Sequence, residues 1–335
     1  MKTLFIGGTG LISSACSEFA IAQGHELFIL NRSASIKHPL PEGATLLTGD
    51  VHTDESLLAS LLADHRFDVV VDWIAYTVQD IERDLRLFRD KTDQFIFISS
   101  ASAYQKPPKH YLITEETLLA NPYWEYSQDK IACEKRLMQA YRDENFPVTI
   151  IRPSLTYGPS QVPLIGASWT HPYTVVDRMK RGQKIIVPGD GTSLWVLTWN
   201  DDFAKGLLGL LGNKKAIGEA FQITSDEVLS WDQIFLEVYQ ALGAEPNVVH
   251  IPSDLIVVHH PEELGTLIGD KIYSSVFDNS KIKRFVPNFG CEVHWAEGLR
   301  RSLAWFEAHP EFQTIDHEMN AKWDQTISAF ERALP

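Results

Sequence analysis

The sequence predicts an α/β fold, a doubly wound parallel sheet with a smaller C-terminal domain interleaved with it. Three observations carry this prediction. Short apolar runs alternate with helical patterns through the first half of the chain, a glycine-rich turn joins the first run to the first helical pattern, and prolines and glycines break the alternation after Arg152-Pro153. Alternating strands and helices produce a parallel sheet covered by its crossover helices. With 335 residues, 44% of them hydrophobic and 22% charged, the chain can bury a large core.

Six apolar runs in the first half are expected to be strands, because each is short and rich in β-branched or aromatic residues. They are Thr3–Ile6, Glu26–Leu30, Thr45–Thr48, Val69–Trp73, Gln94–Ser99 and Val148–Arg152. Segments with the helical spacing of apolar residues lie between them: Ser13–Gln23, Asp54–Ala63, Ile81–Phe88 and Tyr126–Glu144. Gly24 stands where the first helix should end, and Asp54 stands where it can cap the second.

The second half of the chain predicts a second, smaller domain. Prolines and glycines recur between positions 159 and 191, and these residues interrupt regular elements. The later run Ala220–Thr224 has the form of a strand that can rejoin the first sheet. We therefore expect the first domain to comprise residues 1–155 and about 219–225, and the second to comprise about 156–218 and 226–335.

The turn after the first strand has the composition of a dinucleotide-binding loop. It reads Gly7-Gly8-Thr9-Gly10-Leu11-Ile12-Ser13 and opens the first helix. Glycines let the backbone approach a pyrophosphate, whose charge is stabilised by the amides at the helix N-terminus. The sequence therefore predicts a Rossmann-type domain. The predicted cofactor contacts here are Gly7, Thr9, Gly10, Leu11 and Ile12, and Ser13 replaces the usual third glycine.

The end of the second predicted strand favours NADP(H) over NAD(H). An NAD-specific protein usually places an acidic side chain there, against the ribose hydroxyls. This chain has Asn31 followed by Arg32, and a guanidinium can form a charge-assisted hydrogen bond with a 2′-phosphate. Arg32 is equally the kind of residue found on any solvated surface. Asp50 and Val51, after the third strand, are expected near the adenine ring.

Tyr126 and Lys130 begin the long helix with the spacing of a catalytic pair. Positions i and i+4 lie on one face of a helix, one turn apart. A nearby ammonium group stabilises a phenolate and lowers the pKa of the phenol, which makes it a better proton shuttle. A helix-surface pair would show the same spacing, so the surrounding motifs decide between the two interpretations.

Several ordered motifs make the chain resemble the extended short-chain dehydrogenases/reductases, a family of NAD(P)-dependent epimerases, dehydratases and reductases. They are the GGTGLIS turn, Val69–Tyr76, Phe97–Tyr104, the YSQDK segment at 126–130, Ile151–Pro153, the GDG at 189–191 and Asp201–Ala204. The resemblance implies an enzyme that transfers a hydride to or from a hydroxyl or keto substrate. It assigns Tyr126 as the general acid/base, Lys130 as its activator and Ser100 as the group that orients the substrate oxygen. It places Ala75, Tyr76, Pro153 and Ser154 along the cofactor.

The expected substrate is sugar-like but not a standard nucleotide-diphosphate sugar. Family members that bind such sugars commonly have an arginine after the GDG and another before a Gly-Asp pair. Here Trp195 occupies the first position, and Thr266-Leu267-Ile268 precede Gly269-Asp270. Ala101 follows Ser100 where dehydratases carry an acid, which disfavours a dehydratase. Arg178, Lys180 and Arg181 could replace the missing arginines. Aromatic residues suggest a less charged pocket instead, and these are Trp169, His171, Tyr173, Trp195 and Trp199. From this region we assign Ser102, His171 and Trp195 to the substrate.

Composition limits partners and location. A net charge of −14 opposes nucleic-acid binding, no apolar stretch is long enough to span a membrane, and three cysteines without metal-like spacing indicate reduced thiols and no metal. We therefore expect a cytoplasmic enzyme, and the family resemblance implies a homodimer through the helix that carries Tyr126. Two alternatives remain: an RNA-binding or RNA-processing member of the same fold family, and a dinucleotide-sensing regulator without activity. Such regulators typically lose the Tyr-Lys pair, which this chain retains.

Overall fold

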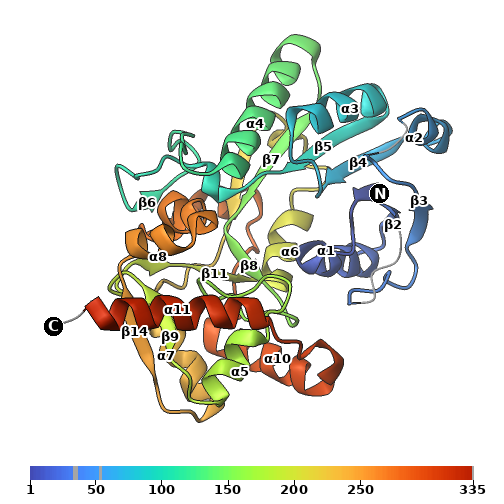
Figure 1. The fold of residues 1–335 in the computed structure, drawn as a ribbon. Helices are drawn as coiled ribbons and strands as arrows, with labels where there is room; N and C mark the ends of the chain where they lie inside the picture. The colour runs from blue at the N-terminus through green and yellow to red at the C-terminus, as the bar shows by residue number, and fades with distance from the viewer. Residues whose placement is uncertain (33–36, 53–54, 334–335) are drawn as a thin grey trace.

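A parallel sheet, built mainly from the N-terminal half of the chain, forms the first of two buried centres. The structure, a computed structural model, describes residues 1–32, 37–52 and 55–333. Seven strands pair in the order β12-β7-β5-β4-β1-β2-β3, each parallel to its neighbours (Figure 1). They are β1 (Lys2–Ile6), β2 (Glu26–Asn31), β3 (Thr45–Thr48), β4 (Phe67–Asp72), β5 (Thr92–Ile98), β7 (Val148–Pro153) and β12 (Ala220–Ile223). The strand order reverses between β1 and β4, so a crevice is expected at their carboxyl ends.

The predicted α/β fold is confirmed. Each strand overlaps its predicted run within a few residues, and β12 pairs with β7 through the contact of Phe221 with Ile151. The helices α1 (Leu11–Ala22), α3 (Val78–Phe88) and α4 (Glu125–Glu144) likewise fall on the predicted segments. The second helix, α2, runs from Glu55 to Leu61, and Asp54, its predicted cap, lies outside the described residues.

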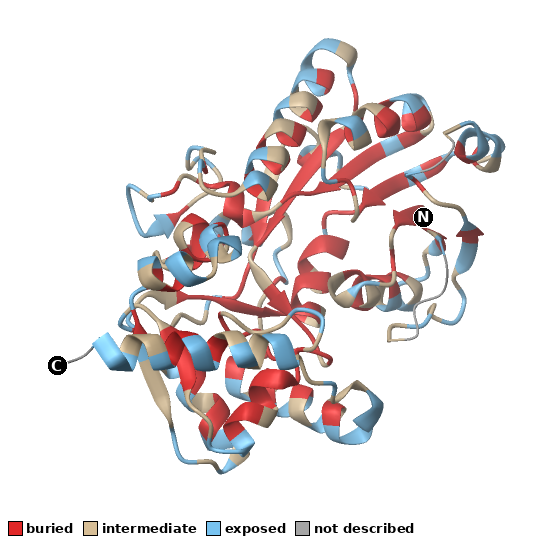
Figure 2. Cartoon of the chain, in the orientation of Figure 1, coloured by how far each residue is buried: buried red, intermediate tan, exposed pale blue. Residues whose placement is uncertain are grey.

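Helices cover both faces of the sheet, which explains why the middle residues of its central strands are apolar on both faces. On one face, α1 and α6 (Asn200–Leu208) pack against a core that contains Phe5 of β1. On the other face, α3 and α4 pack against the neighbouring side chains Leu4 and Ile6. Successive residues of a strand point to opposite faces, and Figure 2 accordingly shows the central strands buried.

The C-terminal half folds around a separate aromatic core that includes Trp199, Trp231 and Trp295. Its main elements are β8 (Leu155–Tyr157) paired with β11 (Leu197–Trp199), β9 (Ile185–Pro188) paired with β14 (Val248–Ile251), and the helices α5 (Thr174–Lys180), α7 (Trp231–Leu242), α10 (Trp295–Ala308) and α11 (His317–Ala333). The other elements are β6 (Leu112–Ile113), β10 (Leu194–Trp195), β13 (Leu229–Ser230), β15 (Val276–Phe277), α8 (Ser253–His259) and α9 (Ser280–Phe285). None of the helices in the described ranges is long and apolar enough to cross a membrane.

Candidate active site

The glycine-rich turn lies between β1 and α1 and has the geometry of a cradle. Gly7 has φ +81°, and a Cβ added there would stand 2.7 Å from Cγ2 of Ile74. Gly10 is the N-cap of α1, and because glycine has no side chain it accepts no hydrogen bond from the amides of the first turn. Ser13 is buried, and its hydroxyl accepts a hydrogen bond from the Gly10 amide at 2.8 Å. The serine at the third glycine position therefore holds the turn together.

A cavity of about 600 Å³ opens at this turn and extends to Tyr126. We call it the glycine-turn cavity. Eleven of the residues predicted to bind the cofactor line it: Gly7, Thr9, Gly10, Leu11, Ile12, Asn31, Tyr76, Tyr126, Lys130, Pro153 and Ser154. Lys37, His38, Ser160 and Gln161 line it as well, and the sequence motifs did not indicate them. A helix N-terminus without a side-chain cap beside a turn that excludes Cβ atoms fits a dinucleotide pyrophosphate.

The four other predicted cofactor residues, Arg32, Asp50, Val51 and Ala75, do not line this cavity. Arg32 is exposed, with Nη1 4.0 Å from Oδ2 of Asp50. Val51 is buried and its carbonyl accepts a hydrogen bond from Arg83 at 3.1 Å. Ala75 is fully buried, and its contribution is a backbone carbonyl that accepts a hydrogen bond from Lys130.

Lys130 is held by backbone carbonyls at the ends of two strands. Its Nζ donates to the carbonyl of Ala75 at 2.7 Å and to that of Ile98 at 2.8 Å. The Ala75 loop is fixed in turn, because Oδ1 of Asp72 accepts hydrogen bonds from the Ile74 and Ala75 amides. Burial lowers the pKa of Lys130 to about 8, while the negative charge of Asp72 acts in the opposite direction. The ammonium is thus oriented before any ligand binds.

Tyr126 lies beside Lys130, with the Lys130 Nζ 5.8 Å from the centre of its ring. Burial raises the pKa of Tyr126 to about 12, and a hydrogen bond with Ser100 acts to lower it. The sequence led us to expect a depressed pKa. The direction is reversed in the protein alone because removal of the phenol from water outweighs the favourable contacts.

A polar network fixes Ser100. Its Oγ lies 2.9 Å from that of Ser102, which accepts a hydrogen bond from Ser127 at 2.8 Å. Asn121 donates to the Ser102 carbonyl at 2.8 Å. Ser127 is the residue after Tyr126, so the network ties the start of α4 to the segment after β5.

A second cavity of about 240 Å³, here the inner cavity, adjoins the first. Ser100, Tyr126, Pro153, Ser154, Leu155 and Trp169 line both cavities. Of the predicted substrate residues, Ser102 and Trp195 line the inner cavity. Lys106, Asp270 and Lys271 also line it, and no sequence motif indicated them as substrate residues. In the sequence, Asp270 was notable because no arginine precedes the Gly269-Asp270 pair.

The structure does not bring the remaining substrate candidates to these cavities. His171 lines neither of them, and its Nδ1 lies 2.8 Å from the Thr314 hydroxyl. Tyr173 and Trp199 belong to the C-terminal core. Arg178 is buried, where it donates to the Lys184 carbonyl at 2.7 Å and pairs with Asp324. It is therefore not a replacement for the missing arginines.

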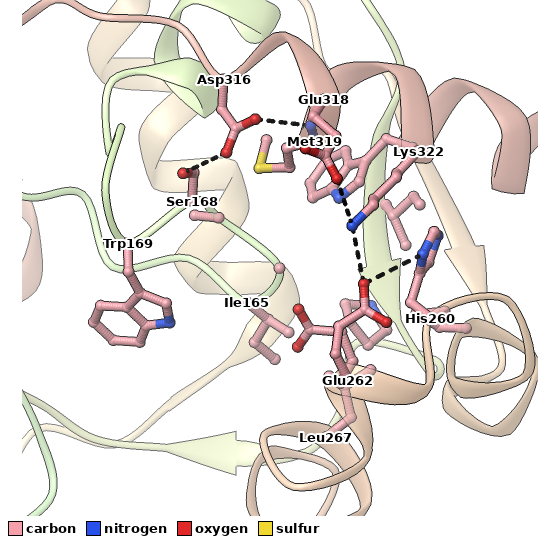
Figure 3. Close-up of a pocket in the computed structure, with 17 residues that line it drawn as sticks. Ile165, Ser168, Trp169, His260, Glu262, Leu267, Asp316, Glu318, Met319 and Lys322 are labelled. Carbon is pink, nitrogen blue, oxygen red and sulfur yellow. Dashed lines mark hydrogen bonds and ion pairs between the residues drawn. The ribbon is translucent and has the colours of Figure 1, made fainter.

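A third cavity of about 300 Å³, the tail cavity, lies against α11 (Figure 3). Lys322 pairs there with Glu262 and Glu318, both at 3.1 Å. Asp316 accepts hydrogen bonds from Ser168 and from the Met319 amide. Trp169 is exposed and lines all three cavities. In the described residues, no group of three His, Cys, Asp or Glu side chains is arranged to hold a metal ion.

The chain is similar to proteins of several activities. It is 25% identical over 294 residues to 2'-dehydrokanamycin reductase of Streptomyces kanamyceticus, covering 86% of this chain and 80% of the reductase. It is 24% identical over 335 residues to UDP-N-acetyl-alpha-D-glucosaminuronate decarboxylase of Bacillus cytotoxicus, covering 91% of this chain and 97% of the decarboxylase. It is 29% identical over 262 residues to the chloroplast stem-loop binding protein of 41 kDa b of Arabidopsis thaliana, covering 74% of this chain and 65% of that protein.

Solved structures share the fold. An epimerase of Methanothermobacter thermautotrophicus superposes with a TM-score of 0.77 at 20% identity, covering 93% of each chain. UDP-glucose 4-epimerase of Thermotoga maritima superposes with a TM-score of 0.72 at 22% identity, covering 92% of this chain and 99% of that one. The model of the NAD dependent epimerase/dehydratase family matches residues 3–224. The resemblance to the extended short-chain dehydrogenases/reductases is thereby confirmed, and the chain is an enzyme that belongs to the NAD-dependent epimerase/dehydratase family.

Proposed function

We propose that this enzyme is an NADP(H)-dependent oxidoreductase that acts on a hydroxyl or keto group of a sugar-like substrate without a nucleotide diphosphate. The observation that carries the proposal is the position of Tyr126 and Ser100, which line both the glycine-turn cavity and the inner cavity. A dinucleotide in the first cavity and a substrate in the second would meet at these two hydroxyl groups.

The proposed roles follow from the contacts. A bound nicotinamide would supply or accept the hydride. Tyr126 would exchange the proton with the substrate oxygen, and Ser100 would hold that oxygen by a hydrogen bond. Lys130, fixed by the Ala75 and Ile98 carbonyls, would stabilise the phenolate form of Tyr126. Trp169 and Leu155, at the junction of the two cavities, would limit the access of water.

Three features support NADP(H). The strand β2 ends in Asn31, whose Nδ2 donates to the Thr9 hydroxyl at 2.6 Å. Asparagine is uncharged, so this position does not repel a 2′-phosphate as a carboxylate would. The Arg32 side chain is 74% exposed, and a surface ion pair as long as its contact with Asp50 contributes little free energy. The guanidinium can therefore turn toward a phosphate. Lys37, which lines the same cavity, adds a second positive charge.

Calorimetric titration with NADPH and NADH tests the cofactor. We expect the wild type to bind NADPH about ten-fold more tightly than NADH, and Arg32→Ala to lose this preference through weaker NADPH binding alone. Arg66→Ala is the matched control, because Arg66 is also exposed and paired with an aspartate, Asp93. A preference for NADH would remove the NADP(H) assignment. Absence of binding to either dinucleotide would overturn the oxidoreductase proposal.

A second candidate is RNA binding, which the 29% identity to the chloroplast stem-loop binding protein favours. The net charge of −14 opposes it, because binding to a phosphate backbone depends on released counterions and basic side chains. Filter binding with a stem-loop RNA at two salt concentrations separates the candidates. Salt-sensitive retention at micromolar protein would support RNA binding, and we expect none.

We also propose the organisation and setting of the enzyme. The dinucleotide would bind to a first domain of residues 1–155 and about 219–225. The substrate would bind to a second domain of about 156–218 and 226–335. The glycine turn of the first part lines the glycine-turn cavity and Trp195 of the second part lines the inner cavity, which supports this division. Gln128, Lys135 and Gln139 of α4 are exposed and would lie in a homodimer interface, which sedimentation equilibrium would reveal. Cys16, Cys133 and Cys291 are free thiols, as expected in the cytoplasm.

A further inference from the structure

The inner cavity contains more positive than negative charge. Its described lining includes three charged side chains, Lys106, Asp270 and Lys271, and the side-chain exposures of the three are 2%, 12% and 9%. Two ammonium groups therefore face one carboxylate in a space nearly shielded from water. Burying a charge is unfavourable unless a partner compensates it, so the arrangement needs an explanation.

Lys106 has a complete set of partners. Its Nζ lies 3.0 Å from Oδ1 of Asp270, 3.4 Å from the Asp270 carbonyl and 3.5 Å from the Ser275 hydroxyl. An ammonium group has three hydrogens to donate, and each has an acceptor within reach. Lys106 and Asp270 thus form a compensated ion pair.

Lys271 has no such set. Its Nζ lies 3.7 Å from Oδ2 of Asp270, beyond hydrogen-bond distance, and 5.8 Å from the centre of the Trp124 ring. No residue within the described ranges accepts a hydrogen bond from this Nζ. A cation is attracted only weakly by an aromatic ring at this distance, so the ring does not take the place of a hydrogen-bond acceptor. The Lys271 ammonium therefore has no hydrogen-bond acceptor among the described residues and can donate to a ligand in the cavity that Tyr126 and Ser100 also line.

The size and walls of the inner cavity fit one compact group. Its volume is about 240 Å³, and Trp124 and Trp195 line it together with Trp169. Aromatic faces commonly bind the apolar faces of ligands while a few polar groups fix their orientation. A single excess positive charge matches a carboxylate, whereas a phosphate monoester carries nearly two negative charges at neutral pH and would leave one of them uncompensated.

We infer that Lys271 binds a carboxylate group of the substrate, so that the enzyme acts on a hydroxy or keto acid such as a uronic acid. This inference rests on the proposed function, since it names the substrate class for the same site. Lys106 acts as a positioning residue: it neutralises Asp270 and leaves the charge of Lys271 for the ligand.

The test measures binding of matched acids and neutral compounds by calorimetry, with and without NADPH. The probes are glucuronate against glucose, galacturonate against galactose, and lactate against propane-1,2-diol. We expect at least one acid to bind about ten-fold more tightly than its neutral partner, the preference to fall to about two-fold in Lys271→Gln, and Lys271→Arg to retain most of it. Lys322→Gln, which removes the same charge at the tail cavity (Figure 3), should leave the preference intact.

Two results would overturn the inference: no acid is preferred in any pair, or the preference survives in Lys271→Gln. Unchanged thermal unfolding of Lys271→Gln shows that a lost preference does not reflect misfolding. The two proposals fail separately. A wild-type protein that binds no dinucleotide but prefers an acid through Lys271 would overturn the proposed oxidoreductase function and leave the carboxylate site standing.

Discussion

Lys130 donates a hydrogen bond to the carbonyl of Ala75 at 2.7 Å and thereby joins helix α4 to the loop that follows β4. The same Nζ reaches Ile98, the last residue of β5. One side chain thus connects two neighbouring strand ends to the helix that carries Tyr126. This connection fixes the distance between the proposed proton donor and the crevice at the centre of the sheet.

Replacement of Lys130 by methionine should change how stability depends on pH. Because the folded-state pKa of Lys130 is lowered to about 8, the unfolded chain binds a proton that the folded protein has released between pH 8 and about 10.5. Wild-type stability therefore gains about 3 kcal/mol from this group as pH rises through that window, and Lys130→Met lacks the gain. Urea unfolding of both proteins at pH 7 and pH 10.5 measures the difference. Equal pH dependences would contradict the lowered pKa.

Tyr126→Phe should reduce turnover by about 10²- to 10⁴-fold, the usual contribution of a positioned acid or base. Cofactor affinity should stay nearly the same, since the substitution removes one hydroxyl from a large cavity. Steady-state kinetics and calorimetry together check both statements. Retention of most of the activity would exclude Tyr126 as the proton donor.

Ser100→Ala should shift the pH profile of alcohol oxidation toward alkaline pH. The hydrogen bond with Ser100 acts to lower the pKa of Tyr126, so its loss raises that pKa and demands a higher pH to form the phenolate. Ser100→Thr keeps a hydroxyl and should restore the original profile. A Ser100→Ala enzyme that is slower at every pH with an unmoved profile would show that the hydroxyl does not tune Tyr126.

Gly7→Ala should abolish dinucleotide binding and destabilise the protein by about 1–3 kcal/mol. The added Cβ would stand 2.7 Å from Ile74, and φ at Gly7 is +81°. Gly24→Ala is a matched control, because Gly24 has φ +77° with no atom within 4 Å of the added Cβ. It should show the backbone strain alone and bind dinucleotide normally. Equal binding by both variants would argue against a cradle at Gly7.

Lys106→Met should destabilise the protein by about 3–5 kcal/mol, whereas Lys271→Met should have a much smaller effect. Lys106 is the main partner of the buried Asp270 carboxylate, and removal of one member of a buried pair leaves the other charge uncompensated. Lys271 contributes no hydrogen bond to Asp270. Thermal or urea unfolding of the two variants checks the contrast, and similar losses of stability would mean that Lys271 is also structural.

The sequence by itself determined the fold and the positions of the residues that a dinucleotide requires. Short apolar runs that alternate with helical patterns, such as Val69–Val71, indicate the strands of a covered parallel sheet. The glycine turn beside Gly7 and the four-residue spacing of Tyr126 and Lys130 are local patterns, because a turn and one helical turn are built from neighbouring residues. Patterns of this kind can be recognised in the sequence because they involve only residues close together in the chain.

Tertiary structure alone decided the electrostatics and the substrate side of the site. Lys106 and Lys271 are 165 positions apart and meet only because the C-terminal part of the chain folds back against the segment after β5. The sequence also indicated His171 as a substrate residue, yet in the structure its Nδ1 lies 2.8 Å from the Thr314 hydroxyl and it lines neither cavity of the site. The pKa of Tyr126 rises where its spacing from Lys130 predicted a fall, because burial depends on every element packed around a group and no local pattern encodes it.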